Sequence, residues 1–154
     1  MRVARGHWLY AVRRAAFVCC LLPGAYGQLA CSIPSLESPD CAAARDGVKE
    51  FYSFHFGNDM SPSVENLKAR QRFLTPELFG ALSSQGETKV DPFTKADTPP
   101  KTFKIAKCTQ EASNKADVAV QIYWRYETGK VDQRELHVEA IKSGDTWLIN
   151  KVSN

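Results

Sequence analysis

The chain has 154 residues and a formal net charge of +3, from 20 basic and 17 acidic side chains. The excess positive charge belongs to the N-terminal end, because four arginines fall in the first 14 residues and no acidic residue precedes Glu37. Without that end, 16 basic side chains face 17 acidic ones. The composition therefore excludes a strongly basic surface, and we expect no nucleic-acid partner. The sequence contains no internal repeat or low-complexity tract, and its length suits one small domain.

The first 27 residues have the pattern of a secretory signal peptide. After the arginines comes an apolar run of eight residues, 15–22, far shorter than the roughly 20 residues that a bilayer-spanning helix needs. Ala25 and Gly27 then provide the small side chains that a signal peptidase accepts. We predict cleavage before Gln28 and export of the remaining chain to the periplasm or the cell exterior. The alternative is an uncleaved apolar helix at the N-terminus.

A second processing site is also present. Residues 29–31, Leu-Ala-Cys, resemble the end of a bacterial lipobox, whose cysteine becomes lipid-modified. The lipobox expects an aliphatic residue three positions before the cysteine, where this chain has Gln28. Lipidation at Cys31 would tether the protein to a membrane, whereas cleavage before Gln28 leaves an exported protein with no membrane partner. Both alternatives stay open at this point.

Three cysteines remain once the signal peptide is removed, namely Cys31, Cys41 and Cys108. In an oxidising compartment we favour a disulfide between Cys41 and Cys108, which would link the first helix to a strand and stabilise the fold by about 2–4 kcal/mol. A different pair with one thiol left over, or three buried reduced cysteines, are the alternatives. No Cys-x-x-Cys or Cys/His spacing of the zinc-binding kind occurs, and we expect neither a metal nor a cofactor.

Helical periodicity governs the first part of the domain, which we place at residues 41–154. Residues 28–40 precede it and contain two prolines and three serines without periodicity, as in a linker. Apolar side chains then recur at intervals of three or four up to Gly57, which predicts a first helix. The same spacing recurs from Val64 to Leu74 and predicts a second helix.

A third helix has the strongest start signal in the chain. Thr75-Pro76-Glu77 combines a capping hydroxyl, a proline at the first helical position and an acid near the positive end of the helix dipole. We predict a short helix over 76–84. Residues 85–100 contain three prolines and scattered charges, which indicate a long crossing loop.

From Lys101 onward the period changes from helical to alternating, which indicates antiparallel strands. We predict strands over 102–109, 117–127, 131–142 and 146–152. Five large or β-branched side chains share one face of the second strand: Val118, Val120, Ile122, Trp124 and Tyr126. The fold class is therefore α+β, with N-terminal helices packed on an antiparallel sheet of about four strands.

This order of elements, ended by a Trp-x-Ile strand, resembles the nuclear transport factor 2-like superfamily, which includes cystatin-like and SnoaL-like cone folds. Four motifs are also similar to those of a small exported bacterial family of unknown function: Phe51-Tyr52, Phe73-Leu74-Thr75-Pro76-Glu77-Leu78, Asp91-Pro92-Phe93 and Trp147-Leu148-Ile149. The resemblance implies helices and a curved sheet that together form a cone around a pocket.

We expect five side chains to line such a pocket: Tyr52, His55, Phe93, Trp124 and Tyr126. His55 follows Phe51 and Tyr52 by three or four residues and would share their inward face. The alternative is that the aromatic side chains are the core itself, since a domain this small needs large side chains to fill it. His137 alternates with buried positions on its strand and is expected at the surface.

The most economical hypothesis is an exported, non-catalytic domain that binds an unknown small molecule or protein. No set of catalytic residues is evident, so enzymatic activity is the less favoured alternative. Members of the resembling superfamily include cofactor-independent isomerases and dehydratases, and in such an enzyme or a related hydrolase His55 or Asp91 would be the base. A third alternative is an assembly partner that forms a homodimer through its outer sheet face.

Overall fold

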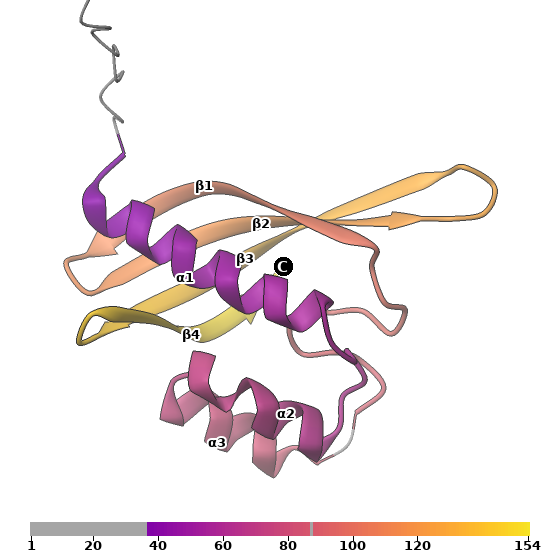
Figure 1. Ribbon diagram of the computed structural model, residues 1–154, viewed down its shortest axis with the longest axis horizontal. Helices are drawn as coiled ribbons and strands as arrows, with labels where there is room; N and C mark the ends of the chain where they lie inside the picture. Colours follow the sequence, from indigo (N-terminus) through magenta and orange to yellow (C-terminus); the bar gives the residue numbers. More distant parts are fainter. Residues whose placement is uncertain (1–36, 87) are drawn as a thin grey trace, which may run out of the picture. The chain divides into compact units, whose positions relative to one another are not determined.

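The computed structural model describes residues 37–86 and 88–154. The predicted signal peptide, both cleavage sites, Cys31 and most of the predicted linker lie outside the described residues. The described chain forms three α-helices, one short 3₁₀ segment and four strands. Their bounds are α1 Pro39–Phe56, α2 Val64–Arg70, η1 Gln71–Phe73, α3 Pro76–Ser84, β1 Thr102–Ala112, β2 Lys115–Arg125, β3 Val131–Ser143 and β4 Thr146–Ser153. Figure 1 shows this order along the chain.

Helix α1 begins where local chemistry favours a helix. The Ser38 hydroxyl accepts a hydrogen bond from the amide of Cys41 at 3.2 Å, and Pro39 occupies the first turn. Helix α1 therefore includes the last two residues of the predicted linker. Its inward face is the one that the spacing predicts, with these side chains buried: Ala44, Val48, Phe51, Tyr52 and His55.

The second predicted helix is shorter than expected. Helix α2 ends at Arg70, and Leu74 is extended and bridges Ile149 of β4 in parallel. The amide of Thr75 also donates to the carbonyl of Ile149 at 2.9 Å. A residue before proline disfavours the helical region, so Thr75 turns the chain onto the sheet edge before α3 begins at Pro76, as predicted.

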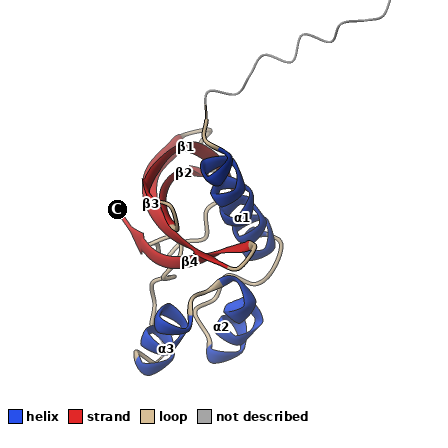
Figure 2. Ribbon diagram, turned by 90° about the vertical axis from the view of Figure 1, so that its left-hand side faces the viewer, coloured by secondary structure: helices blue, strands red, loops and turns tan. Residues whose placement is uncertain are grey.

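The four strands form an antiparallel meander in the order β1-β2-β3-β4. Figure 2 shows the sheet curving around α1, with α2 and α3 beyond the β4 edge. The α+β class and the arrangement of N-terminal helices on an antiparallel sheet are confirmed.

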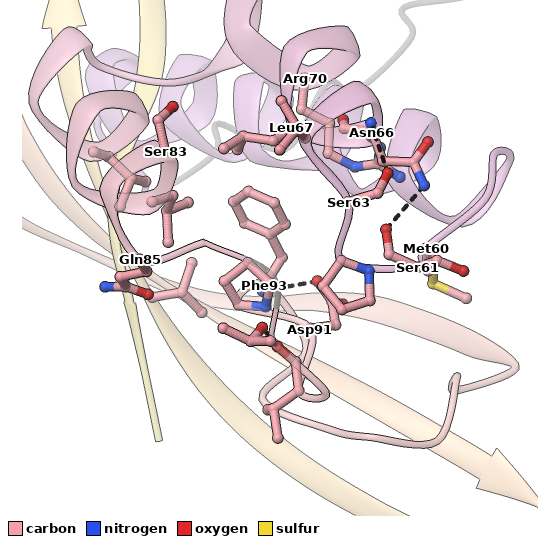
Figure 3. A pocket seen from close by; sticks show the side chains of 18 of the residues that line it. Met60, Ser61, Ser63, Asn66, Leu67, Arg70, Ser83, Gln85, Asp91 and Phe93 are labelled. Carbon is pink, nitrogen blue, oxygen red and sulfur yellow. Dashed lines mark hydrogen bonds between the residues drawn. The ribbon is translucent and has the colours of Figure 1, made fainter.

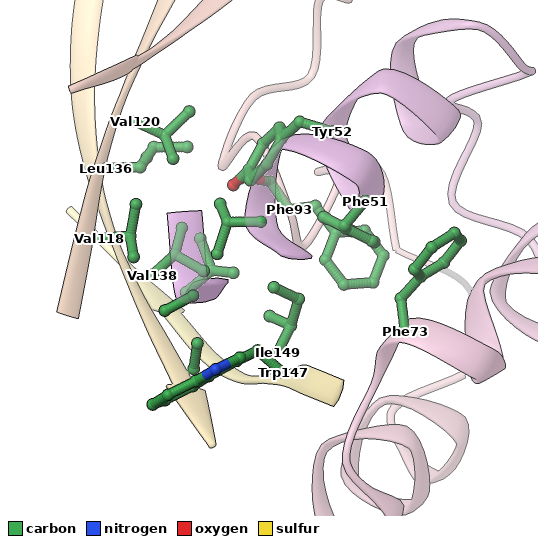
Figure 4. Packing of buried hydrophobic residues seen from close by; sticks show 14 of the residues in the cluster. Phe51, Tyr52, Phe73, Phe93, Val118, Val120, Leu136, Val138, Trp147 and Ile149 are labelled. Atoms are coloured by element: carbon green, nitrogen blue, oxygen red, sulfur yellow. The ribbon is translucent and has the colours of Figure 1, made fainter. Parts of the chain in front are cut away.

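The concave face of the sheet is filled by side chains (Figure 4). Val118, Val120 and Ile122 of β2 are fully buried against α1, and Leu136, Val138 and Ala140 of β3 are buried beside them. Trp124 belongs to the same apolar cluster. Tyr52 and Trp124 therefore belong to the packed core instead of bordering a hollow, because burying large side chains stabilises a domain of this size.

Strand β1 carries a bulge that redirects one cysteine. Ile105 pairs with Val120 and Cys108 pairs with Val118. Between these pairs β1 therefore has one residue more than β2. Strict alternation from Ile105 would point Cys108 outward, but the extra residue turns it toward α1. Cys108 is disulfide-bonded to Cys41, with 5.8 Å between their Cα atoms.

Candidate functional site

A pocket of about 410 Å³ lies between α2, α3 and the loop that follows α3. Its apolar wall includes Leu67 of α2 and both Leu78 and Leu82 of α3, while Phe93 contributes from the loop. Val64 and Val90 line it as well and are about half exposed, at 53% and 46%. Figure 3 labels Leu67 and Phe93 of this wall together with polar residues around the pocket. Apolar walls with a few polar groups at this volume are typical of small-molecule sites.

Three buried polar side chains form the floor of the pocket. The Arg70 Nε–H donates to His55 Nδ1 at 2.7 Å, and His55 Nε2 lies 2.8 Å from Asp91 Oδ2. Arg70 is 2% exposed and His55 is 1% exposed. Because Nδ1 accepts from an arginine, the ring proton is assigned to Nε2, which donates to the Asp91 carboxylate. The imidazole is neutral in this arrangement and links two charged groups.

The hydrogen-bonding capacity of Arg70 is directed mostly to the chain itself. Its two Nη atoms donate to the carbonyls of Asn66 and Asp59, each at 2.7 Å. Burial lowers the pKa of Arg70, while the carboxylates of Asp91 and Asp59 act in the opposite direction. An arginine nevertheless stays charged in a protein, so the network ties α2 to α1 and to the loop between them.

Asp91 also holds the loop that follows α3 through hydrogen bonds. Its Oδ2 accepts from the Thr94 hydroxyl at 2.6 Å and the Thr94 amide at 3.1 Å, and its Oδ1 accepts from the amide of Phe93 at 3.2 Å. Burial alone would raise the pKa of Asp91, but the bonds from His55, Thr94 and Phe93 outweigh burial and lower it. Asp91 is thus an ionised carboxylate that accepts four hydrogen bonds.

Tyr52 supports the loop from behind the pocket. Its hydroxyl donates to the carbonyl of Phe93 at 2.9 Å, and its ring is fully buried. Burial is the main cause that raises the pKa of Tyr52, and the nearby Asp91 charge adds to it. Tyr52 is therefore a neutral structural donor.

The five expected pocket residues do not meet at one site. His55 and Phe93 line the pocket, whereas Tyr52 lies in the core beside it. Trp124 borders a separate depression of about 510 Å³. Tyr126 is 43% exposed, because β2 ends at Arg125 and the chain turns there into the β2–β3 hairpin. His137 is on the surface, as expected, with Nδ1 2.9 Å from Asp117 Oδ2.

Sequence reasoning missed the cationic residues of the pocket. Arg70 occupies an apolar position in the helical spacing of α2, and a charged residue in that register is a signal of a buried polar contact. Lys95 carries no comparable signal, because nothing in the spacing of the 85–100 loop indicates which side chains turn inward.

One group of potential metal ligands occurs among the described residues, formed by Glu37, Cys41 and Cys108. The two sulfur atoms are bonded to each other, so neither is a free thiolate. The donor set does not fit a metal ion.

No family model and no curated protein matches the chain. It is similar in structure to a protein of unknown function from Bacteroides thetaiotaomicron, with TM-score 0.53 and 20% identity over 75% of this chain and 92% of the other. It is also similar to a chain in the type VI native effector–immunity complex Tae3–Tai3 from Ralstonia pickettii, with TM-score 0.54 and 21% identity over 76% of this chain and 94% of the other. Both likenesses establish the fold. In the described part of the chain, no helix is both long and apolar enough to cross a membrane.

Proposed function

We propose that this protein is a non-catalytic binding domain whose ligand occupies the pocket between α2 and α3. The observation that carries the proposal is an open pocket with apolar walls above a floor whose polar groups are already bonded to one another. Such a floor keeps its shape without a ligand, and a preformed pocket loses little conformational entropy when a ligand enters.

The same floor argues against a proton-transfer enzyme. A general base needs a free lone pair within reach of its substrate. His55 Nδ1 accepts from Arg70, and Asp91 Oδ2 already accepts from His55 and Thr94 while Oδ1 accepts from Phe93. The lowered pKa of Asp91 further weakens it as a base. A binding domain keeps the hydrogen bonds among Arg70, His55 and Asp91 intact. Proton transfer by His55 would require its bond from Arg70 to break.

Blocking the pocket tests the proposal. Nile red, a neutral dye that fluoresces in apolar surroundings, should bind the native protein and lose binding in Ala81→Trp, whose indole would fill the pocket from α3. Ala81 is exposed and lines the pocket, so the variant should fold. Ser84→Trp is the matched control, because Ser84 is exposed on the same helix and does not line the pocket. Absence of native-state binding, or equal binding by both variants, would contradict the proposal.

Export remains part of the proposal. The disulfide between Cys41 and Cys108 supports it, since disulfides persist mainly outside the cytosol. Mass spectrometry of the mature N-terminus tests it: a start at Gln28 supports a soluble exported protein, and a diacylated Cys31 supports a tethered one. An intact Met1 on the protein isolated from its natural host would contradict export.

Membership of the nuclear transport factor 2-like superfamily is likewise proposed, supported by three helices followed by a curved meander. An alignment of homologues that connects this chain to proteins of a different fold would overturn it.

Binding of a protein partner is a second candidate, favoured by the β2–β3 hairpin. This hairpin extends beyond α1 (Figure 1) and exposes Tyr126 and Val131, the latter at 53%. The likeness to a chain from an effector–immunity complex supports a protein partner. In this case the double variant Tyr126→Asp/Val131→Asp should abolish a complex reconstituted from purified components, and Ala81→Trp should preserve it. The opposite pattern would place the partner at the pocket.

A further inference from the structure

Lys95 lies at the pocket on a backbone that ordinarily suits glycine. Its φ is +53°, and it is the only residue other than glycine in the described chain with a positive φ. A Cβ in this left-handed region costs energy, so the surrounding structure must hold it there. The amide of Lys95 donates to the carbonyl of Asp91 at 2.8 Å, and its own carbonyl accepts from Arg134 Nη1. The floor of the pocket and β3 together fix this backbone.

The side chain of Lys95 lines the pocket and is only partly exposed. In the described chain, its ammonium group has no hydrogen-bond or ion-pair partner. The nearest acid of the floor, Asp91, already accepts four bonds. Burial lowers the pKa of Lys95, partly offset by the charge of Asp91. A half-buried ammonium group without a partner is unfavourable, and an anionic ligand could form an ion pair with it.

The charges of the side chains that line the pocket also favour an anionic ligand. Among the described residues that line it, three side chains are cationic, namely Arg70, Lys95 and Lys151, and one, Asp91, is anionic. Arg70 and Asp91 are linked through His55 in the floor, and Lys151 interacts with Glu139 of the neighbouring strand. The charge left to a ligand is therefore that of Lys95, which is positive.

We infer that the pocket takes a small amphipathic anion, with its apolar body between α2 and α3 and a carboxylate against Lys95. This inference rests on the proposed function and specifies the chemistry of its ligand. The wall formed by Leu67, Leu78 and Leu82 suits an aliphatic or aromatic body. The ion pair with Lys95 then supplies direction and selectivity for charge.

Three probes of equal chain length separate the apolar body from the charge: decanoate, decanol and decyltrimethylammonium, each below its micelle concentration. Isothermal titration calorimetry should show that decanoate binds most tightly and the cation most weakly. Lys95→Met keeps the aliphatic stem and should weaken decanoate binding about tenfold while leaving decanol binding unchanged. Lys49→Met is the matched control, because Lys49 is exposed on α1 and does not line the pocket. Lys49→Met should change neither the affinity for decanoate nor the affinity for decanol.

The outcomes distinguish the inference from the function on which it rests. Equal affinity for decanoate and the cation, or full decanoate affinity in Lys95→Met, overturns the role of Lys95 while the binding proposal stands. Failure of all three probes to bind overturns both. A loss of decanoate affinity that is equal in Lys95→Met and Lys49→Met also overturns the inference, since it would reflect overall charge alone.

Discussion

Gly47 of α1 lies directly against Trp147 of β4. A Cβ on Gly47 would stand 3.0 Å from the carbonyl oxygen of Trp147 and 3.1 Å from its Cβ. The carbonyl oxygen belongs to a strand backbone and cannot rotate away as a side chain could. Glycine at this position therefore sets how closely α1 approaches the sheet.

The first prediction follows from this contact. Gly47→Ala should lower the free energy of unfolding by about 1–3 kcal/mol, because the helix must move off the sheet. Gly80→Ala is the control, since a Cβ at Gly80 of α3 meets nothing within 4 Å and alanine favours the helix. Gly80→Ala should raise the free energy of unfolding by about 0.5–1 kcal/mol. Urea unfolding of both variants measures these free energies. An unchanged free energy of unfolding in Gly47→Ala would contradict the close packing of α1 on β4.

The disulfide gives a second prediction. Replacing both Cys41 and Cys108 by alanine should lower the free energy of unfolding by about 2–4 kcal/mol, because the unfolded chain loses a constraint across 67 positions. Cys31→Ser should leave stability unchanged if Cys41 and Cys108 are the native pair. A large loss in Cys31→Ser alone would instead indicate a different pairing.

Acid should weaken the floor of the pocket. The pKa of Asp91 in the folded protein lies below its ordinary value of 3.8, so the carboxylate stabilises the fold at neutral pH. That stabilisation is fully present above the unfolded-state pKa and is lost as the pH falls through the lower, folded-state pKa. Unfolding measured from pH about 6 downward should show a shallower acid loss in Asp91→Asn than in the wild type.

Asp145→Asn is the control for that series, because Asp145 lies exposed in the turn between β3 and β4. Its acid profile should follow the wild type. A profile of Asp91→Asn that is as steep as the wild type would show that this carboxylate does not stabilise the fold.

A fourth prediction concerns Lys95. Lys95→Gly relieves the left-handed strain and should raise the free energy of unfolding by about 0.5–1 kcal/mol, net of the greater freedom of glycine in the unfolded chain. The same variant should bind decanoate more weakly. Lys101→Gly, at a residue outside the positive-φ region, should not gain stability. If Lys95→Gly lost stability and kept its affinity for decanoate, lysine here would have a structural role only.

Much of the fold was predictable because it depends on local patterns. The spacing of Ala44, Val48 and Phe51 shows the buried face of α1, and Thr75-Pro76-Glu77 marks the start of α3. Alternation along β3 separates buried Leu136 from exposed His137 in the same way. These features depend on the period of one element and on capping chemistry, both of which are visible in a single sequence.

The site was less predictable because it depends on contacts between elements. A one-residue bulge in β1 decides that Cys108 faces α1, and no residue pattern in 105–108 marks it. The pocket arises because α2 ends early at Arg70 and α3 is placed beyond the β4 edge by Leu74 and Thr75. Trp124 and Tyr126 were expected around the pocket, but Trp124 is buried in the core and Tyr126 lies exposed in the β2–β3 hairpin.

An NMR titration of the oxidised protein with decanol, followed at each backbone amide, tests the central claim most directly. Shift changes should be confined to the residues that line the pocket, in α2, α3, the 60–63 and 88–95 segments, His55 and the Lys151–Val152 end of β4, and should be lost in Ala81→Trp but not in Ser84→Trp. Changes spread over the outer face of the sheet, or equal changes in the two tryptophan variants, would contradict a ligand site between α2 and α3.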